Sequence, residues 1–92
     1  RNDVLRDAAV TYLELLRAEH ALAVAQDALR NTERLADLTR QYAETGQGLE
    51  SDFQRVEAEL AGRMNDVFVQ VEAVQVASAR LAQLMHADPT QL

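Results

Sequence analysis

The sequence predicts an all-α protein, a long antiparallel two-helix coiled-coil hairpin. Two observations predict this fold class, and a third excludes other classes. The 92 residues include only three Gly and one Pro, so few positions can interrupt a helix. Apolar residues recur every seven positions on both sides of residues 46–50, which is typical of a coiled coil. The chain has no Cys, so we expect neither a disulfide framework nor a thiolate metal site.

The composition also argues against two classes of function. The formal net charge is −6, and all nine basic residues are Arg. An acidic chain without Lys is poorly suited to binding phosphate backbones, so we expect no nucleic-acid partner. No run of 18 apolar residues occurs, so no segment reads as a membrane-spanning helix. Because the sequence opens at Arg1, we expect it to be an internal part of a larger protein.

The first helix is predicted over about residues 3–45, which contain neither Gly nor Pro. One column of residues spaced by seven is apolar, and a second column three residues later is small. Small residues at a helix seam allow the two helix axes to approach closely. The first column is Ala8, Leu15, Leu22, Leu29, Ala36 and Ala43, and the second is Val4, Thr11, Ala18, Ala25, Thr32 and Thr39.

The turn is predicted at residues 46–50. Gly46 can adopt a left-handed conformation and so end the first helix. Leu49 is the apolar residue of a polar tip. Composition alone leaves two interpretations open: either Leu49 folds back onto the end of the hairpin, or it is exposed for a partner.

The second helix is predicted over about residues 51–87. Ser51 and Gln54 fit a capping box with Ser51 as the N-cap, and Asp88-Pro89 predicts the end. Residues 67–71 alternate like a strand, but we predict helix there because the seven-residue column continues through them. That column is Phe53, Leu60, Val67, Val74 and Leu81, and the predicted second column, four residues later, is Met64, Val71, Ser78 and Met85.

A second apolar face is predicted on this helix, nearly opposite its seam. A helix in a simple hairpin buries one stripe, so two stripes indicate neighbours on both sides. The alternative is chance in a segment rich in Ala and Val. We expect the hairpin to need partner helices, because two helices make a thin core. The predicted face consists of Ala58, Gly62, Val69, Ala73 and Val76.

No residue pattern favours catalysis, a cofactor or a metal. His20 and His86 have no His or Cys at a metal-ligand spacing. The 15 carboxylates are scattered at spacings typical of a solvated surface, and Glu59 and Arg63 form a favourable i,i+4 pair. We therefore expect a protein that is not an enzyme, with no catalytic, cofactor-binding or metal site.

Three segments in order resemble the TolC-type outer membrane efflux proteins. Residues 12–18 read YLELLRA, residues 46–60 read GQGLESDFQRVEAEL, and residues 79–89 read ARLAQLMHADP. They are similar to the family's YLxLL helix, Gly-containing turn followed by a helix, and L..LLG.DP finish. The resemblance covers nearly the whole chain. Phe53, Met85-His86 and Leu49 depart from the family's usual residues.

The resemblance implies a fold and a role. Members of the family are homotrimers with an outer membrane β-barrel and a periplasmic α-helical barrel built from hairpins. This chain would be one such hairpin, with a weak preference for the first of the two repeats. The implied function is that of a passive conduit for drugs, metals or secreted proteins. The implied location is the periplasmic part of a protein of the Gram-negative outer membrane.

The resemblance also implies partners and contact residues. The tip of the hairpin would dock on a periplasmic adaptor that connects to an inner membrane transporter. From their position near the tip, Arg40, Tyr42 and Asp52 are expected to form contacts between hairpins that hold the tip closed. The residues implied in adaptor contact are Thr45, Gly46, Gln47, Gly48, Leu49, Glu50, Ser51 and Asp52.

Two alternatives remain at this point. The chain could be the coiled-coil hairpin of the adaptor itself. The adaptor tip, however, typically has Arg, Leu and Ser spaced seven residues apart, and this pattern is absent here. It could also be a general coiled-coil scaffold. In isolation the hairpin is expected to self-associate as a helical bundle.

Overall fold

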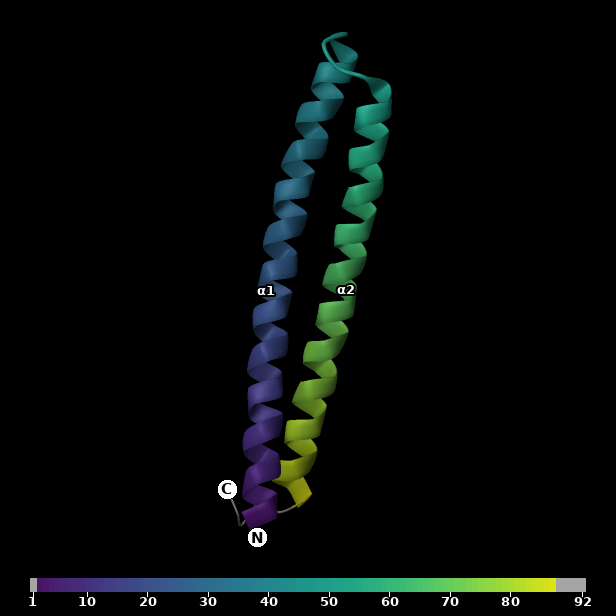
Figure 1. Cartoon of the computed structure of the whole chain (residues 1–92). Helices are drawn as coiled ribbons and strands as arrows, with labels where there is room; N and C mark the ends of the chain where they lie inside the picture. Colours follow the sequence, from purple (N-terminus) through teal and green to yellow (C-terminus); the bar gives the residue numbers. More distant parts are fainter. Residues whose placement is uncertain (1, 88–92) are drawn as a thin grey trace. The chain divides into compact units, whose positions relative to one another are not determined.

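The computed structural model describes residues 2–87. Helix α1 spans Asn2–Glu44 and helix α2 spans Glu50–Ala87. The helices run in opposite directions and form an antiparallel hairpin, with no strand among the described residues (Figure 1). The predicted all-α hairpin is therefore confirmed, and residues 67–71 are helical as predicted. The expected stop at Asp88-Pro89 lies outside the described residues.

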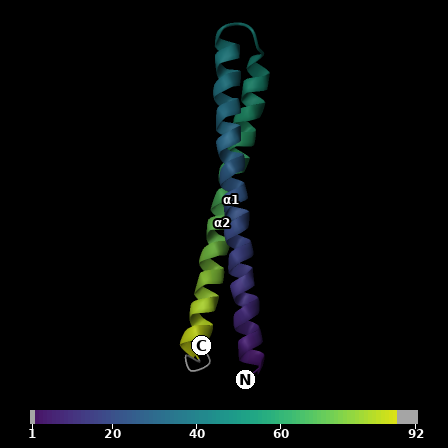
Figure 2. The same cartoon turned by 90° about the vertical axis from the view of Figure 1, so that its left-hand side faces the viewer.

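The hairpin consists of two compact units, each containing a section of both helices. The turn unit comprises Ala23–Phe68, and the terminal unit comprises Arg1–Leu22 with Val69–Leu92. Figures 1 and 2 show the turn between α1 and α2, which belongs to the turn unit.

The seam of α1 follows both predicted columns. Every residue of these columns is buried or half-buried, from Val4 to Ala43. Thr32, which is 6% exposed, donates its hydroxyl to the Ala28 carbonyl oxygen at 2.9 Å. Thr39 donates in the same way to the Leu35 carbonyl oxygen at 2.9 Å. These bonds let polar residues sit in the seam without an unsatisfied hydroxyl.

The seam of α2 corrects one sequence prediction. The column from Phe53 to Leu81 is half-buried throughout, as predicted. The column four residues later is wrong, because Met64 and Met85 are each 47% exposed, Ser78 is exposed, and only Val71 is half-buried. The second seam column lies three residues after the first, as in α1. It consists of Val56, Arg63, Gln70, Ala77 and Leu84.

Two polar residues explain why the pattern pointed to the other column. Arg63 and Gln70 interrupt the true column, whereas the column with Met64 and Met85 is apolar apart from Ser78. Arg63 occupies the seam with its stem and extends its guanidinium to Glu59 at 3.5 Å and to Asp66 at 3.6 Å. A long basic side chain can cover apolar surface in this way while its charge stays in water.

The core is thin in both units. The buried hydrophobic residues are Ala36, Val56 and Ala77, and no large side chain among the described residues is fully buried. Within residues 2–87, fifteen large hydrophobic residues are exposed, from Leu16 at 42% to Phe68 at 70%. None of the described helices is long and apolar enough to cross a membrane. These exposed apolar residues make the outer faces of the hairpin candidates for contact with a partner.

Candidate functional site

The turn ends α1 through a complete Schellman motif. Gly46 has a φ of +80°, the left-handed conformation predicted for it. The Gln47 amide donates to the Tyr42 carbonyl oxygen at 2.9 Å, and the Gly46 amide donates to the Ala43 carbonyl oxygen at 3.2 Å. The Gly48 amide also donates to the Tyr42 carbonyl oxygen, at 3.0 Å. Backbone hydrogen bonds to the last carbonyl oxygens of α1 therefore give the end of this helix a defined geometry.

Gly48 also allows a close approach of the chain to α1. A Cβ at this position would lie 3.0 Å from the Tyr42 Cβ. The turn can fold tightly over the last turn of α1 because this residue has no side chain. Thr45 adds a hydroxyl bond to the Tyr42 carbonyl oxygen at 3.1 Å.

The start of α2 corrects the predicted cap. The Leu49 carbonyl oxygen accepts from the Asp52 amide at 3.1 Å and from the Phe53 amide at 3.3 Å. Leu49 therefore occupies the N-cap position, and Ser51 lies inside the first turn of the helix. The capping-box prediction is wrong because the tight turn over Tyr42 starts the helix earlier. Glu50 and Asp52 place negative charge in that first turn, where the helix dipole favours it.

The predicted contact residues form an exposed tip. Leu49 is 65% exposed, which favours the interpretation that it is available to a partner. Gly48 and Asp52 are half-buried, and the other predicted contact residues are exposed: Thr45, Gly46, Gln47, Glu50 and Ser51.

The three predicted tip-closing residues belong to separate local interactions. Arg40 pairs with Asp37 at 3.4 Å, and Asp52 pairs with Arg55 at 2.6 Å, each on its own helix. The Tyr42 side chain is 47% exposed. Within this hairpin the structure therefore does not bring these side chains together in an ion pair or hydrogen bond. Their role between hairpins stays a prediction.

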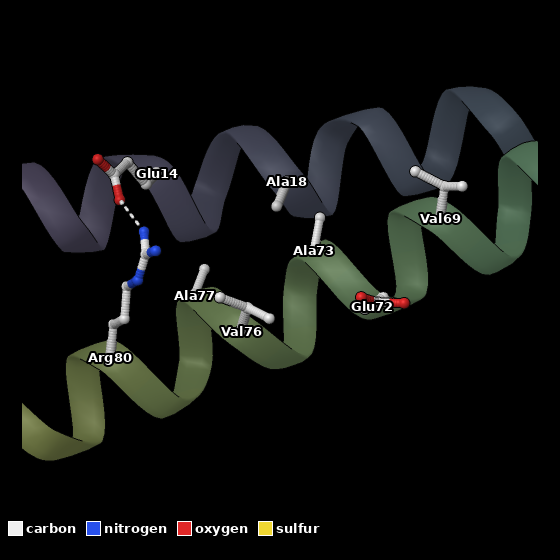
Figure 3. A pocket seen from close by; sticks show the side chains of 8 residues that line it. All are labelled: Glu14, Ala18, Val69, Glu72, Ala73, Val76, Ala77 and Arg80. Atoms are coloured by element: carbon white, nitrogen blue, oxygen red, sulfur yellow. Dashed lines mark ion pairs between the residues drawn. The ribbon is translucent and has the colours of Figure 1, made fainter.

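A shallow groove lies between the helices of the terminal unit (Figure 3). Its volume is about 440 Å³, and Glu14 and Arg80 pair across it at 3.8 Å. Ala18 and Ala73 point toward one another from the two helices. The remaining lining residues are Val69, Glu72, Val76 and Ala77. A groove lined by small aliphatic groups beside one ion pair can accept an apolar side chain from a neighbouring helix.

The predicted second apolar face lies outside the seam. Ala58 and Gly62 are exposed, Val69 is 52% exposed and Val76 is 44% exposed. Ala73 is half-buried in the groove just described. The sequence analysis missed an apolar stripe on α1, although its spacing of three, four or seven residues was available as a signal. This stripe consists of Val24, Ala28, Leu35, Leu38 and Tyr42.

The histidines and carboxylates of the described residues are dispersed over the surface. His20 and His86 are both exposed, and His86 lies in the last turn of α2. No group of three or more His, Asp or Glu within residues 2–87 is arranged to hold a metal ion. The predicted pair of Glu59 and Arg63 is present at 3.5 Å on the surface of α2. The features of this surface that could bind something are its tip and its apolar faces.

Comparison with known proteins finds no protein family, no characterised protein and no solved structure that matches this chain.

Proposed function

We propose that this chain is a periplasmic hairpin of a TolC-type outer membrane channel, a passive conduit that docks on an adaptor through its tip. The observation that carries the proposal is the exposed, tightly capped turn with Leu49 at 65% exposure. That turn begins the second of the three family-like segments, residues 46–60. A defined backbone with a protruding apolar side chain suits docking between proteins, because little conformational freedom is lost on binding.

The exposed apolar residues of both units also support the proposal. Hairpins in a helical barrel pack against neighbours on two sides, and this hairpin has apolar residues outside its seam on both helices. In the full channel, three copies would assemble with an outer membrane barrel, and an inner membrane transporter would supply the energy. In this role the hairpin has no catalytic function and no cofactor.

The experiment is a matched pair of substitutions in the whole protein that contains this hairpin. Leu49→Glu places a charge at the tip, whereas Leu13→Glu makes the same change at a residue of the terminal unit that is 57% exposed. We expect Leu49→Glu to weaken co-purification with the adaptor about tenfold or more, because a charge would be buried without a partner. We expect Leu13→Glu to leave it unchanged.

Location and flanking sequence provide a second readout. We expect the whole protein in the outer membrane fraction as a trimer, with amphipathic strands flanking the hairpin. A lipoyl or small β-barrel domain beside the hairpin would instead identify the adaptor. A protein without either neighbour, found outside the envelope, would identify a general coiled-coil scaffold and reject the proposal.

A further inference from the structure

Part of one flank of the terminal unit has no charged side chain, and Glu19 lies on the same flank just beyond this part. The Glu14–Arg80 pair marks one flank of the seam, and both residues directly precede a member of the first seam column. In an antiparallel pair, residues that directly follow the second column share the opposite flank. Between residues 5 and 16, α1 has no carboxylate, guanidinium or imidazole on this flank, either directly after the second column or at the next position toward solvent. The same holds for α2 between residues 71 and 85. This uncharged face consists of Leu5, Ala9, Tyr12, Leu16, Val71, Gln75, Ser78, Ala82 and Met85.

The two helices contribute different shapes to the uncharged face. From α1, Leu5 is 47% exposed, Tyr12 is 50% exposed and Leu16 is 42% exposed, so this helix presents a ridge of large side chains. From α2, the exposed residues between Gln75 and Met85 include the small Ser78 and Ala82. The face thus combines a ridge and a trough. Such a surface is complementary to a copy of itself.

The charge distribution also favours a second copy of the chain on the uncharged face. The chain carries a net charge of −6, so two copies repel each other in general. A face without carboxylates or basic groups brings no unpaired charge into an interface, where its desolvation would be costly. Among the described residues of the terminal unit, the opposite flank includes Asp7 and Glu14, so self-association there would bring carboxylates into the interface.

The surface area fits a two-copy assembly as well. The chain exposes 6784 Å², whereas a compact monomer of its 10.2 kDa mass would expose about 5300 Å². The uncharged face presents on the order of 600 Å² per copy, or about 1200 Å² in a pair, which reaches the lower bound of specific interfaces. One further copy on this face would therefore cover part of the excess exposed area.

We propose that two copies of this chain dimerise through the uncharged face of the terminal unit, with the α1 ridge of each copy packed in the α2 trough of the other. The result is an isologous four-helix interface in which α1 packs on the partner copy's α2. This inference does not depend on the proposed role in transport. It concerns the self-association of the 92-residue chain and names the residues that mediate it.

The first test is sedimentation equilibrium of the 92-residue chain and two matched variants. Leu16→Glu places a charge on the ridge, and Leu38→Glu makes the same change on α1 in the turn unit, at a residue of similar exposure, 45%. We expect a dimer for the unsubstituted chain. We expect the dissociation constant to rise at least tenfold with Leu16→Glu and less than about twofold with Leu38→Glu.

Two outcomes would overturn the proposal. One is a monomer at concentrations of hundreds of micromolar, which would mean that a different protein covers the face. The other is an equal effect of both variants, which would mean that association is not specific to this face. Circular dichroism checks that Leu16→Glu remains helical. If it does not, Ala82→Glu in the trough decides by the same criterion.

A cross-linking experiment tests the proposed packing of ridge against trough. The chain has no Cys, so Leu16→Cys and Gln75→Cys each introduce a single thiol. When the two variants are mixed and oxidised, we expect the disulfide-linked species to contain one chain of each. Disulfide-linked pairs of Leu16→Cys alone in excess would place α1 against α1 and reject the arrangement.

Discussion

Acidic and basic side chains pair along one helix in the turn unit, whereas Glu14 and Arg80 pair between the helices in the terminal unit. Pairs three or four residues apart stabilise a helix before it packs. A pair between helices forms only once both helices are in place. The pairs of the turn unit are Asp27–Arg30, Asp37–Arg40, Asp52–Arg55, Glu59–Arg63 and Arg63–Asp66.

The connection between the helices adds to this difference. In the turn unit, α1 ends at Glu44 and α2 begins at Glu50, so only a short turn must close before the helices meet. Short closures have a low entropic cost. In the terminal unit, the helix sections come from residues far apart in sequence. Local interactions thus stabilise the turn unit, while the terminal unit depends on contacts between helices and, by our proposal, between copies.

The largest expected effect comes from the turn unit's core. Val56 is 8% exposed in the seam, so Val56→Asp would bury a charge without a partner. We expect a loss of about 3 kcal/mol or more in the free energy of unfolding, measured by urea denaturation followed by circular dichroism. The control is Met64→Asp, because Met64 is 47% exposed. A larger effect at Met64 than at Val56 would reverse the seam assignment.

An intermediate effect is expected at the turn itself. Gly46→Ala forces a residue with a Cβ into the left-handed conformation at φ +80°. We therefore expect the free energy of unfolding, measured by thermal or urea denaturation, to fall by about 1 kcal/mol.

Gly62→Ala is the matched control for Gly46→Ala. A Cβ at Gly62 would meet nothing within 4 Å. Because Ala favours helix over Gly, this change should raise the free energy of unfolding by roughly 0.5 to 1 kcal/mol. Effects of equal sign for the two glycines would contradict the role assigned to the turn.

The smallest effect is expected for the pair between the helices. Glu14 and Arg80 are separated by 3.8 Å, and their side chains are 46% and 65% exposed. Exposed pairs contribute little, so Arg80→Gln should change the free energy of unfolding by less than about 0.5 kcal/mol. The measurement is denaturation at low and high salt. A loss well above this value would show that charge, rather than apolar packing, holds the terminal unit together.

The sequence predicted the candidate site unevenly. Gly46 correctly predicted the end of α1, because glycine is the usual residue in a left-handed helix cap. The same reasoning failed at Ser51, because the cap position depended on how tightly the chain folds over Tyr42. Composition left the position of Leu49 open, and its 65% exposure became visible only in the structure.

The sequence by itself determined the helical class, the position of the turn and the whole seam of α1. Rare glycines and an unbroken seven-residue spacing suffice for these, because both act through local backbone preference and helix geometry. The tertiary structure decided the second seam column of α2. Arg63 and Gln70 look like surface residues, yet they lie in the seam because the partner helix selects a face by geometry as well as by polarity. The tertiary structure also decided which apolar residues remain outside the seam, since the exposure of each side chain depends on where the other helix lies.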